Sequence, residues 1–232
     1  MPNVAAIIPC LDEEAAIFEV VSAVRAQGIA TVIVVDGGSR DRTAERARDA
    51  GATVVAETRR GYGRAVQSGI AALPAEARIV LFLDGDGSDP PERIPEVLAP
   101  ILAGRAAFVH GTRIKGLREP GSLSPQQVAA GRIAEILLRL FYGARFSDMS
   151  PFRAIRREAL DGLGMREETY GWNLEMLMRV AAAKLPAEEV AVGQRCRRGG
   201  VSKVSGNPRA VAAACWSIAT TFLRLAAALR RA

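Results

Sequence analysis

Cysteine and histidine are scarce in this chain of 232 residues, which has three cysteines and a single histidine. Cys10, Cys196 and Cys215 stand far apart, without the paired spacing of a zinc site or of a disulfide-rich secreted domain. His110 has no second histidine or cysteine pair beside it, which favours a structural role over a ligand role. The chain also begins without the basic segment and cleavage site of an export signal, so we expect a cytoplasmic protein.

Aromatic residues make up only 5% of the chain, and the sequence contains no nucleic-acid recognition motif. Because stacking on aromatic side chains is a usual part of single-strand binding, nucleic acid is not an expected partner. Compositional disorder and collagen are excluded too, since 49% of the residues are hydrophobic. The length predicts one globular domain that needs neither a disulfide nor a structural metal to fold.

Acidic residues are missing from the last part of the chain, because no aspartate or glutamate follows Glu189. Eight arginines and lysines do follow it, which is more than the whole net charge of +6. One interpretation is a solvated, arginine-rich surface. The other is contact with the phosphate groups of a substrate or of a membrane surface.

The first half alternates short apolar runs with amphipathic segments, which predicts an α/β fold with a mostly parallel sheet flanked by helices. We expect strands at 4–9, 31–36, 52–56, 78–83 and 107–111, and helices at 14–26, 42–50, 63–73 and 91–102. In the second half we expect helices at 128–142 and 172–183, and short strands near 152–155 and at 188–194. Glycines and prolines interrupt residues 112–127, which predicts a mobile loop over the site.

The last segment, 208–232, is predicted to be an amphipathic helix appended to a main domain at 1–207. Val211, Ile218 and Phe222 fall on one side of a helical wheel, and Arg209 and Arg224 fall on the other. Its uncharged run, 210–223, is shorter than the roughly 20 residues that cross a bilayer. The helix could pack on the protein's own core, or lie in a membrane interface with the help of the basic tail.

Acidic turns follow three of the expected strands. The first strand leads to residues 10–14, the second to Asp36, and the fourth to Asp84 and Asp86. Ligands of an open parallel sheet bind beyond the carboxyl ends of its strands, so these turns are expected to converge on one edge. Two carboxylates one residue apart, next to glycines, can hold a divalent cation that also binds diphosphate oxygens, and Asp36 suits a ribose or base donor.

The glycine-rich run 61–65 superficially resembles a dinucleotide fingerprint. Its spacing is wrong, and it follows the third expected strand instead of the first, so a hydride-transfer enzyme is excluded. A nucleotidyltransferase is disfavoured as well, because residues 10–13 lack a glycine-rich loop with a lysine.

Taken in order, the motifs of this chain resemble those of family 2 inverting glycosyltransferases with the GT-A fold, in the branch of the dolichol-phosphate mannose and glucose synthases. The resemblance extends from residue 4 to about residue 203. The matching motifs are 9–14, 35–39 with Asp41 and Thr43, 61–65, 84–86 with Pro90 and Pro91, 111–113, Asp148 with Ser150 and 152–154, Gly171 with Glu175, and Arg197 with Gly200, Ser202 and Lys203.

The resemblance implies a metal-dependent inverting transfer of a hexose from a UDP- or GDP-sugar to a polyprenyl phosphate, with the enzyme in the cytoplasm or on the inner face of the cell membrane. The residues implied to bind the nucleoside are Pro9, Leu11, Glu13 and Asp36. Asp84 and Asp86 would hold Mg²⁺ or Mn²⁺ on the diphosphate, which makes Asp86 part of the catalytic apparatus. The residues implied to contact phosphates are Arg113, Arg132, Arg197 and Lys203.

The acceptor decides which side chains the reaction needs. A hydroxyl acceptor must lose a proton, for which Asp148 is the candidate base. A lipid phosphate is already anionic, so positioning by Arg113 and Arg132 would dominate, and the abundance of arginine near the expected loop and tail favours this case. The alternatives are a soluble or lipid hydroxyl acceptor, and a catalytically silent module that binds a sugar nucleotide or a membrane surface.

Overall fold

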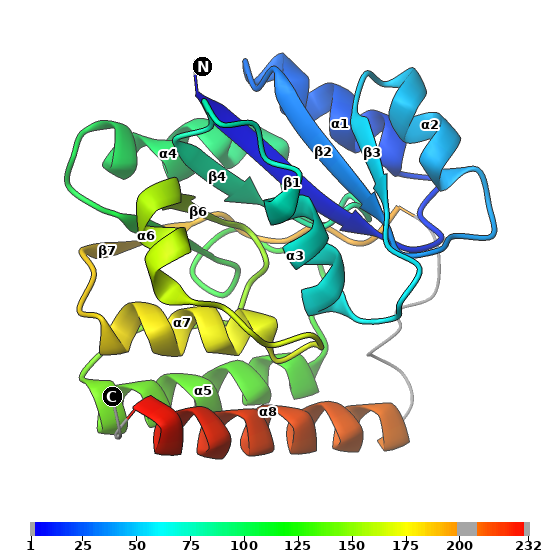
Figure 1. The fold of residues 1–232 in the computed structure, drawn as a ribbon. Helices are drawn as coiled ribbons and strands as arrows, with labels where there is room; N and C mark the ends of the chain where they lie inside the picture. The colour runs from blue at the N-terminus through cyan, green and yellow to red at the C-terminus, as the bar shows by residue number, and fades with distance from the viewer. Residues whose placement is uncertain (1–2, 199–207, 230–232) are drawn as a thin grey trace.

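One sheet of seven strands forms the centre of the part of the chain that the structure, a computed structural model, describes: residues 3–198 and 208–229 (Figure 1). The strands are β1 (Val4–Cys10), β2 (Thr31–Asp36), β3 (Thr53–Ala56), β4 (Ile79–Phe82), β5 (Phe108–Thr112), β6 (Arg153–Arg156) and β7 (Ala187–Ala191). Their order is β3-β2-β1-β4-β6-β5-β7. Only β6 runs antiparallel to its neighbours in this sheet, so the predicted α/β fold with a mostly parallel sheet is confirmed.

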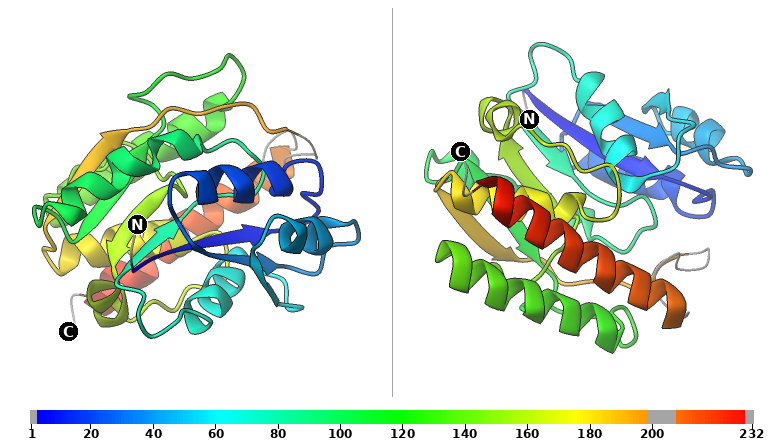
Figure 2. Two further views of the ribbon diagram at one scale, coloured as in Figure 1. Left: turned by 90° about the horizontal axis from the view of Figure 1, so that it is seen from above. Right: turned by 60° about the horizontal axis from the view of Figure 1, so that its bottom comes forward.

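Helices cover both faces of the sheet (Figure 2). The helices are α1 (Ile17–Ala26), α2 (Thr43–Asp49), α3 (Tyr62–Ala71), α4 (Ile94–Leu102), α5 (Pro125–Tyr142), α6 (Arg157–Leu163), α7 (Trp172–Ala182) and α8 (Pro208–Leu229). One hydrophobic cluster joins α1, α2 and α4 to the sheet, and a second joins α3, α5, α6, α7 and α8 to the opposite face. Alternate residues of β1 serve the two clusters: Ile8 enters the first and Ile7 the second.

Helix α5 begins three residues earlier than the predicted start at 128. Pro125 occupies its first turn, where the missing N–H costs nothing, and Ser124 caps it by accepting a hydrogen bond from the Gln127 backbone at 3.3 Å. Pro125 was expected to interrupt the chain, and it begins a helix instead. The preceding segment of the predicted loop is tied to the strand region after β7, because Glu119 N donates to Gln194 O at 2.9 Å.

Three helices form an additional layer below the sheet. α7 contacts the sheet-facing core, and both α5 and α8 contact α7. α5 and α8 lie side by side in Figures 1 and 2, and the rings of Phe141 and Phe222 join them edge to face at 5.3 Å. On α8, Phe222 and Leu225 are buried in the second cluster.

His110 on β5 is buried without a hydrogen-bond partner for either ring nitrogen. Its ring packs against those of Phe108 and Phe146, at centroid distances of 6.4 and 5.8 Å. Burial and the nearby positive charge of Arg153 lower its pKa from 6.5 to about 3, because a charged imidazole would be neither solvated nor paired there. His110 is therefore a neutral part of the core.

Replacing His110 with Phe is expected to weaken the pH dependence of stability. Between about pH 3 and pH 6.5 the unfolded chain binds a proton at this histidine and the folded protein does not, so protonation favours unfolding and stability falls as the pH is lowered. The free energy of unfolding should therefore change more steeply with pH in the wild type than in His110→Phe, and the two slopes should differ by up to about 1.4 kcal/mol per pH unit. Urea unfolding at several pH values measures both slopes.

The chain has a single histidine, so no other imidazole contributes to the difference between the two proteins. Parallel slopes for the wild type and His110→Phe would contradict a neutral, buried His110.

Candidate active site

The loops after β1, β2 and β4 meet at one edge, because β1 lies between β2 and β4 in the sheet. The first two loops are locked together by backbone hydrogen bonds. Gly37 N donates to Cys10 O at 2.8 Å, and Glu13 N donates to Thr43 Oγ1 at 2.8 Å. Asp41 in turn accepts hydrogen bonds from the backbone and hydroxyl of Thr43. The predicted convergence of these acidic turns is therefore present.

The turn after β4 depends on a glycine. A Cβ on Gly85 would overlap Cys10 Sγ, so only glycine lets this turn pack against the end of β1. Inside the turn, Asp84 N donates to Asp89 Oδ2 at 2.9 Å, and Ser88 N donates to Asp86 Oδ1 at 2.9 Å. The side chains of the turn therefore organise its own backbone.

Three carboxylates crowd this turn. Asp86 and Asp89 are buried, and Asp84 is half-buried. Burial, with the charges of Asp89 and Asp86, raises the pKa of Asp84 well above its usual value, and burial raises that of Asp89 to about 7. The Oδ1 atom of Asp89 is buried without a hydrogen-bond partner. The turn thus favours a nearby positive charge.

Arg197 supplies part of that charge from the segment after β7. Its Nη2 donates to Glu13 Oε1 at 2.5 Å, and its Nε lies 3.3 Å from Asp86 Oδ2. The same segment is held by its backbone, since Arg195 N donates to Ser88 O at 2.9 Å and Arg198 N donates to Asp86 O at 3.0 Å. Residues 195–198 therefore lie against the acidic turn after β4, and Arg197 bridges Asp86 of this turn and Glu13 of the loop after β1.

The donor atoms of this turn suit a hard divalent cation. Oxygen ligands from one or two carboxylates are what Mg²⁺ uses when phosphates and water complete its shell. Within the described residues, no group of three histidine, cysteine, aspartate or glutamate side chains is placed to hold a metal by itself. Asp84 and Asp86 remain the predicted ligands, and the arrangement fits a metal that is bound together with a diphosphate.

Arg113 and Asp148 form a two-armed ion pair near this edge. Arg113 Nε donates to Asp148 Oδ2 at 2.6 Å, and Nη2 donates to Oδ1 at 2.7 Å. The aspartate side chain is 3% exposed and the arginine side chain 11%. Although burial raises the pKa of Asp148, the hydrogen bonds and charge of Arg113 outweigh it and lower the value to about 2. A carboxylate in this state is a poor proton acceptor, which favours the supporting role over the role of base.

Helix α5 presents a glycine to this ion pair. A Cβ on Gly131 would lie 3.5 Å from Asp148 Oδ1, so the helix passes close beside the carboxylate. Arg132, the next residue, pairs instead with Glu135 at 2.8 Å, and its side chain is 62% exposed. The structure does not join Arg132 to Arg113, although both were predicted to contact phosphate.

The remaining predicted residues divide into two groups. Pro9, Leu11 and Asp36 lie at the carboxyl edge and are half-buried. Asp36 Oδ1 accepts a hydrogen bond from Ser39 N at 3.1 Å, which fixes its carboxylate at the end of β2. Lys203 lies outside the described residues.

Sequence reasoning missed a buried arginine behind the site. Arg153 on β6 is fully buried, and its guanidinium donates to the backbone carbonyls of Ser150, Pro151 and Asn173. Burial lowers its pKa to about 10, while the charge of Asp84 favours its charged form. An arginine inside the short expected strand at 152–155 was the available signal, because charged residues are almost never fully buried without compensation.

Sequence reasoning also missed Glu57, which lies at the carboxyl edge of the sheet. It follows β3 directly, and it accepts hydrogen bonds from Arg59 Nε at 3.0 Å and from Ser68 Oγ at 2.8 Å. Hydrogen bonds from Arg59 and Ser68 lower its pKa to about 2. The rule that singled out Asp36 and Asp84, a carboxylate just after a strand, would also have found it.

The loop before α7 is anchored by Glu175. This side chain is 1% exposed and accepts hydrogen bonds from Glu167 N at 2.7 Å and from Arg179 Nε at 2.8 Å. From this loop, Glu168 O accepts a hydrogen bond from Arg64 N at 3.1 Å, at the start of α3. On α3, Tyr62 Oη donates to Asp84 Oδ1 at 3.4 Å, so the loop supports the helix that reaches the acidic turn.

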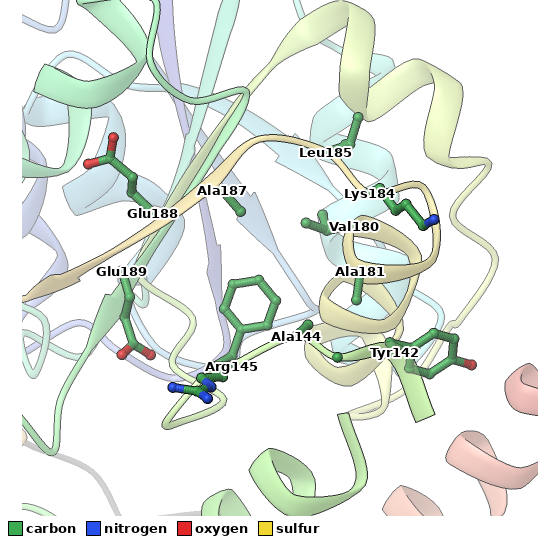
Figure 3. Close-up of a pocket in the computed structure, with 12 residues that line it drawn as sticks. Tyr142, Ala144, Arg145, Val180, Ala181, Lys184, Leu185, Ala187, Glu188 and Glu189 are labelled. Carbon is green, nitrogen blue, oxygen red and sulfur yellow. The ribbon is translucent and has the colours of Figure 1, made fainter. Parts of the chain in front are cut away.

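A cleft of about 270 Å³ lies away from these groups (Figure 3). It is lined by the end of α7, the chain after α5 and the beginning of β7, including Arg145, Lys184 and Glu188. The beginning of β7 belongs to the amino edge of the parallel strands, opposite the acidic turns. The cleft is therefore separate from the candidate site.

Comparison with known sequences identifies a family match. The model of the family described as Glycosyl transferase family 2 matches residues 5–164. An uncharacterised glycosyltransferase of Mycobacterium tuberculosis is 38% identical over 212 residues, which cover 89% of this chain and 91% of that protein. The dolichyl-phosphate hexose transferase of Haloferax volcanii is 36% identical over 202 residues, covering 85% of each.

Solved structures show the same fold. Glucosyl-3-phosphoglycerate synthase from Mycobacterium tuberculosis, in complex with phosphoglyceric acid, matches with a TM-score of 0.76 and 25% identity, covering 96% of this chain and 79% of that chain. Another structure of that enzyme, at 24% identity and a TM-score of 0.76, contains Mn²⁺, UDP and glucosyl-3-phosphoglycerate. The predicted GT-A fold is confirmed.

Asp148→Asn is expected to destabilise the fold by about 3 kcal/mol, because it leaves the nearly buried Arg113 guanidinium without its anionic partner. Arg113→Met should cost a similar amount. The double variant should lose clearly less than the sum of the two single variants, since neither charge is then left unpaired. Urea unfolding of the four proteins measures this coupling.

Asp161→Asn is the matched control, because Asp161 pairs with Arg157 at 2.9 Å on the surface. Its loss should change stability by less than about 1 kcal/mol. Additive effects of Asp148→Asn and Arg113→Met would show that the two residues do not act as a unit.

Proposed function

The chain belongs to glycosyl transferase family 2, and from this premise we propose that it transfers a hexose, with Mg²⁺ or Mn²⁺, from a UDP- or GDP-sugar to a polyprenyl phosphate. The assignment of a phosphate acceptor rests on Arg113, whose guanidinium is fixed by Asp148 close to the acidic turn. The similarity to a dolichyl-phosphate hexose transferase supports the same acceptor class.

The donor half of the proposal rests on the acidic turn. Asp84 and Asp86 would hold the metal, which supplies positive charge to the diphosphate that leaves. Arg197 pairs with Asp86 and Glu13 at the acidic turn, which supports the proposed role of its guanidinium in binding a donor phosphate. Asp36 and the half-buried Leu11 would bind the nucleoside at the ends of β2 and β1.

The acceptor half rests on charge and orientation. A phosphate monoester oxygen is anionic at neutral pH and needs no base, whereas Arg113 can orient it toward the anomeric carbon. Both carboxylate oxygens of Asp148 accept hydrogen bonds from Arg113, so Asp148 holds that guanidinium in place. The same contacts lower the pKa of Asp148 to about 2, so it has little affinity for a proton. The residues thus favour positioning over proton removal.

A hydroxyl acceptor is the second candidate. One observation favours it: the solved structure with 25% identity is of an enzyme in complex with phosphoglyceric acid, a small hydroxy acid. With such an acceptor the reaction needs a base, and Asp148 would have to leave Arg113 to serve. A catalytically silent binding module is the third candidate, and the acidic turn with its paired arginine argues against it.

The choice of acceptor bears on location. In the described ranges, 3–198 and 208–229, no helix combines the length and the apolar character needed to cross a bilayer. A polyprenyl phosphate lies in a membrane, so we propose that the enzyme works at the cytoplasmic membrane surface as a peripheral protein.

Release of nucleoside diphosphate tests the acceptor class. Purified protein with Mg²⁺ or Mn²⁺ is given UDP- and GDP-hexoses, with and without a short-chain polyprenyl phosphate. Release that depends on the lipid phosphate is expected. Equal release of nucleoside diphosphate with and without the lipid phosphate would indicate a hydroxyl acceptor. No release with any donor would favour the catalytically silent module.

Asp86→Asn should weaken metal-dependent donor binding while the protein stays folded, because the substitution removes one predicted metal ligand and keeps the side-chain volume. We expect donor affinity at saturating Mn²⁺ to fall at least about tenfold, the scale of losing one charged contact. Calorimetry with and without metal measures it, and Asp161→Asn is the control. Unchanged metal-dependent affinity would remove Asp86 from the metal site.

A further inference from the structure

Helix α5 carries an apolar stripe on its outer side. Ile133, Ile136 and Leu140, spaced by three and four residues, are 54%, 55% and 74% exposed. On the inner side, Ala134 and Leu138 are buried in the second core cluster. The helix is therefore apolar on two sides, and its own core covers only one of them.

Helix α8 repeats this pattern next to it. Trp216 and Leu223, seven residues apart and so on one side of the helix, are 73% and 67% exposed. Phe222 and Leu225 on the opposite side are buried. α5 and α8 lie side by side (Figure 2), joined by Phe141 and Phe222, so two neighbouring helices each expose apolar side chains. We call Ile133, Ile136, Leu140, Trp216 and Leu223 the apolar face.

Positive charge flanks the α5 part of the apolar face. Arg132 and Arg139 are exposed on α5, and Arg145 is exposed just beyond its end. Glu135 is the one acidic residue in the sequence of α5, and α8 has none. An exposed apolar surface with a basic border is typical of contact with anionic lipid.

We propose that the apolar face docks on an anionic lipid surface and holds the enzyme there. Large exposed apolar patches mark interaction sites, and an exposed tryptophan such as Trp216 suits the boundary between headgroups and acyl chains. A second copy of the chain fits less well, because a twofold contact would bring the arginines of both copies to one interface. The choice of lipid rests on the proposed polyprenyl-phosphate acceptor.

Helix α5 borders the candidate site, and α8 contacts a loop that supports it. Gly131 on α5 lies beside Asp148, only two residues before Ile133. On α8, Arg224 forms an ion pair with Glu167, whose loop supports the start of α3. A membrane bound to the outer sides of α5 and α8 would therefore lie next to the elements that hold Arg113 and Tyr62. A lipid phosphate could reach the site without leaving the bilayer surface.

Cosedimentation with vesicles tests the proposal. The probe is phosphatidylglycerol mixed with phosphatidylcholine, without donor, metal or polyprenyl phosphate, and pure phosphatidylcholine is the neutral comparison. The wild type should bind the anionic vesicles preferentially. Ile136→Asp with Leu140→Asp, and separately Leu223→Asp, should weaken binding at least about tenfold by placing charge in the acyl boundary.

Leu102→Asp is the matched control, because Leu102 is 57% exposed on α4, on the other face of the sheet. It should bind vesicles like the wild type, and circular dichroism should show every variant to be folded. Wild-type protein that ignores anionic vesicles, or apolar-face variants that bind as well as the wild type, would overturn the proposal. A wild-type dimer that these substitutions split, without vesicle binding, would assign the face to a second copy instead.

The experiments distinguish a protein that does not dock on membranes from one that does not transfer a hexose to polyprenyl phosphate. Vesicle binding is measured without donor and acceptor, so it stands if no nucleoside diphosphate is released. The apolar-face variants should retain turnover with a water-soluble short-chain polyprenyl phosphate, and lose it selectively when a long-chain acceptor is embedded in vesicles. Equal loss with both acceptors would point to damage at the site and overturn the docking role.

Discussion

The repulsion among carboxylates in the turn after β4 is the constraint on which the site depends. Asp84, Asp86 and Asp89 share a largely buried turn, where each charge is costly unless a cation compensates it. Arginines from distant segments supply this compensation. Arg197 pairs directly with Asp86, and the charge of the buried Arg153 interacts favourably with that of Asp84. A bound divalent metal would complete this compensation, which gives the site a physical reason to bind one.

The same balance of charge also explains the pairing of Arg113 with Asp148, at the proposed acceptor site. The charge of Arg113 acts unfavourably on the buried Arg153 and would do the same on a metal held by Asp84 and Asp86, and Asp148 offsets that charge through two short hydrogen bonds. Both arms of the guanidinium are then fixed in direction, while part of the arginine remains accessible. A fixed cation of this kind suits an anionic acceptor better than a neutral one, because it adds orientation and charge together.

The layer of α5, α7 and α8 connects the site to the outer surface. α7 fills the space between the sheet and the two outer helices, and Glu175 on α7 anchors the loop that supports α3. α5 approaches Asp148 with a glycine and turns isoleucines and leucine outward. Helix α5 therefore both borders the candidate site and exposes apolar side chains, which connects the proposed docking surface to the proposed chemistry.

The sequence by itself determined the alternation of strands and helices, and with it the edge at which Asp36 and Asp84 meet. Both follow from local periodicity and from the rule that the carboxyl ends of parallel strands share an edge. The family resemblance added the candidate roles of Arg113 and Arg197. The start of α5 was misplaced because Pro125 was read as an interruption, although proline is equally suited to a first helical turn.

Only the tertiary structure decided which charges meet. The pairing of Asp148 with Arg113 and of Glu13 with Arg197 depends on contacts that no sequence spacing encodes, since the partners are 35 and 184 residues apart. Burial is equally invisible in the sequence, and it is burial that gives Asp89, His110 and Arg153 their altered pKa values. Periodicity is a local property of the chain, whereas charge compensation is a property of the packed fold.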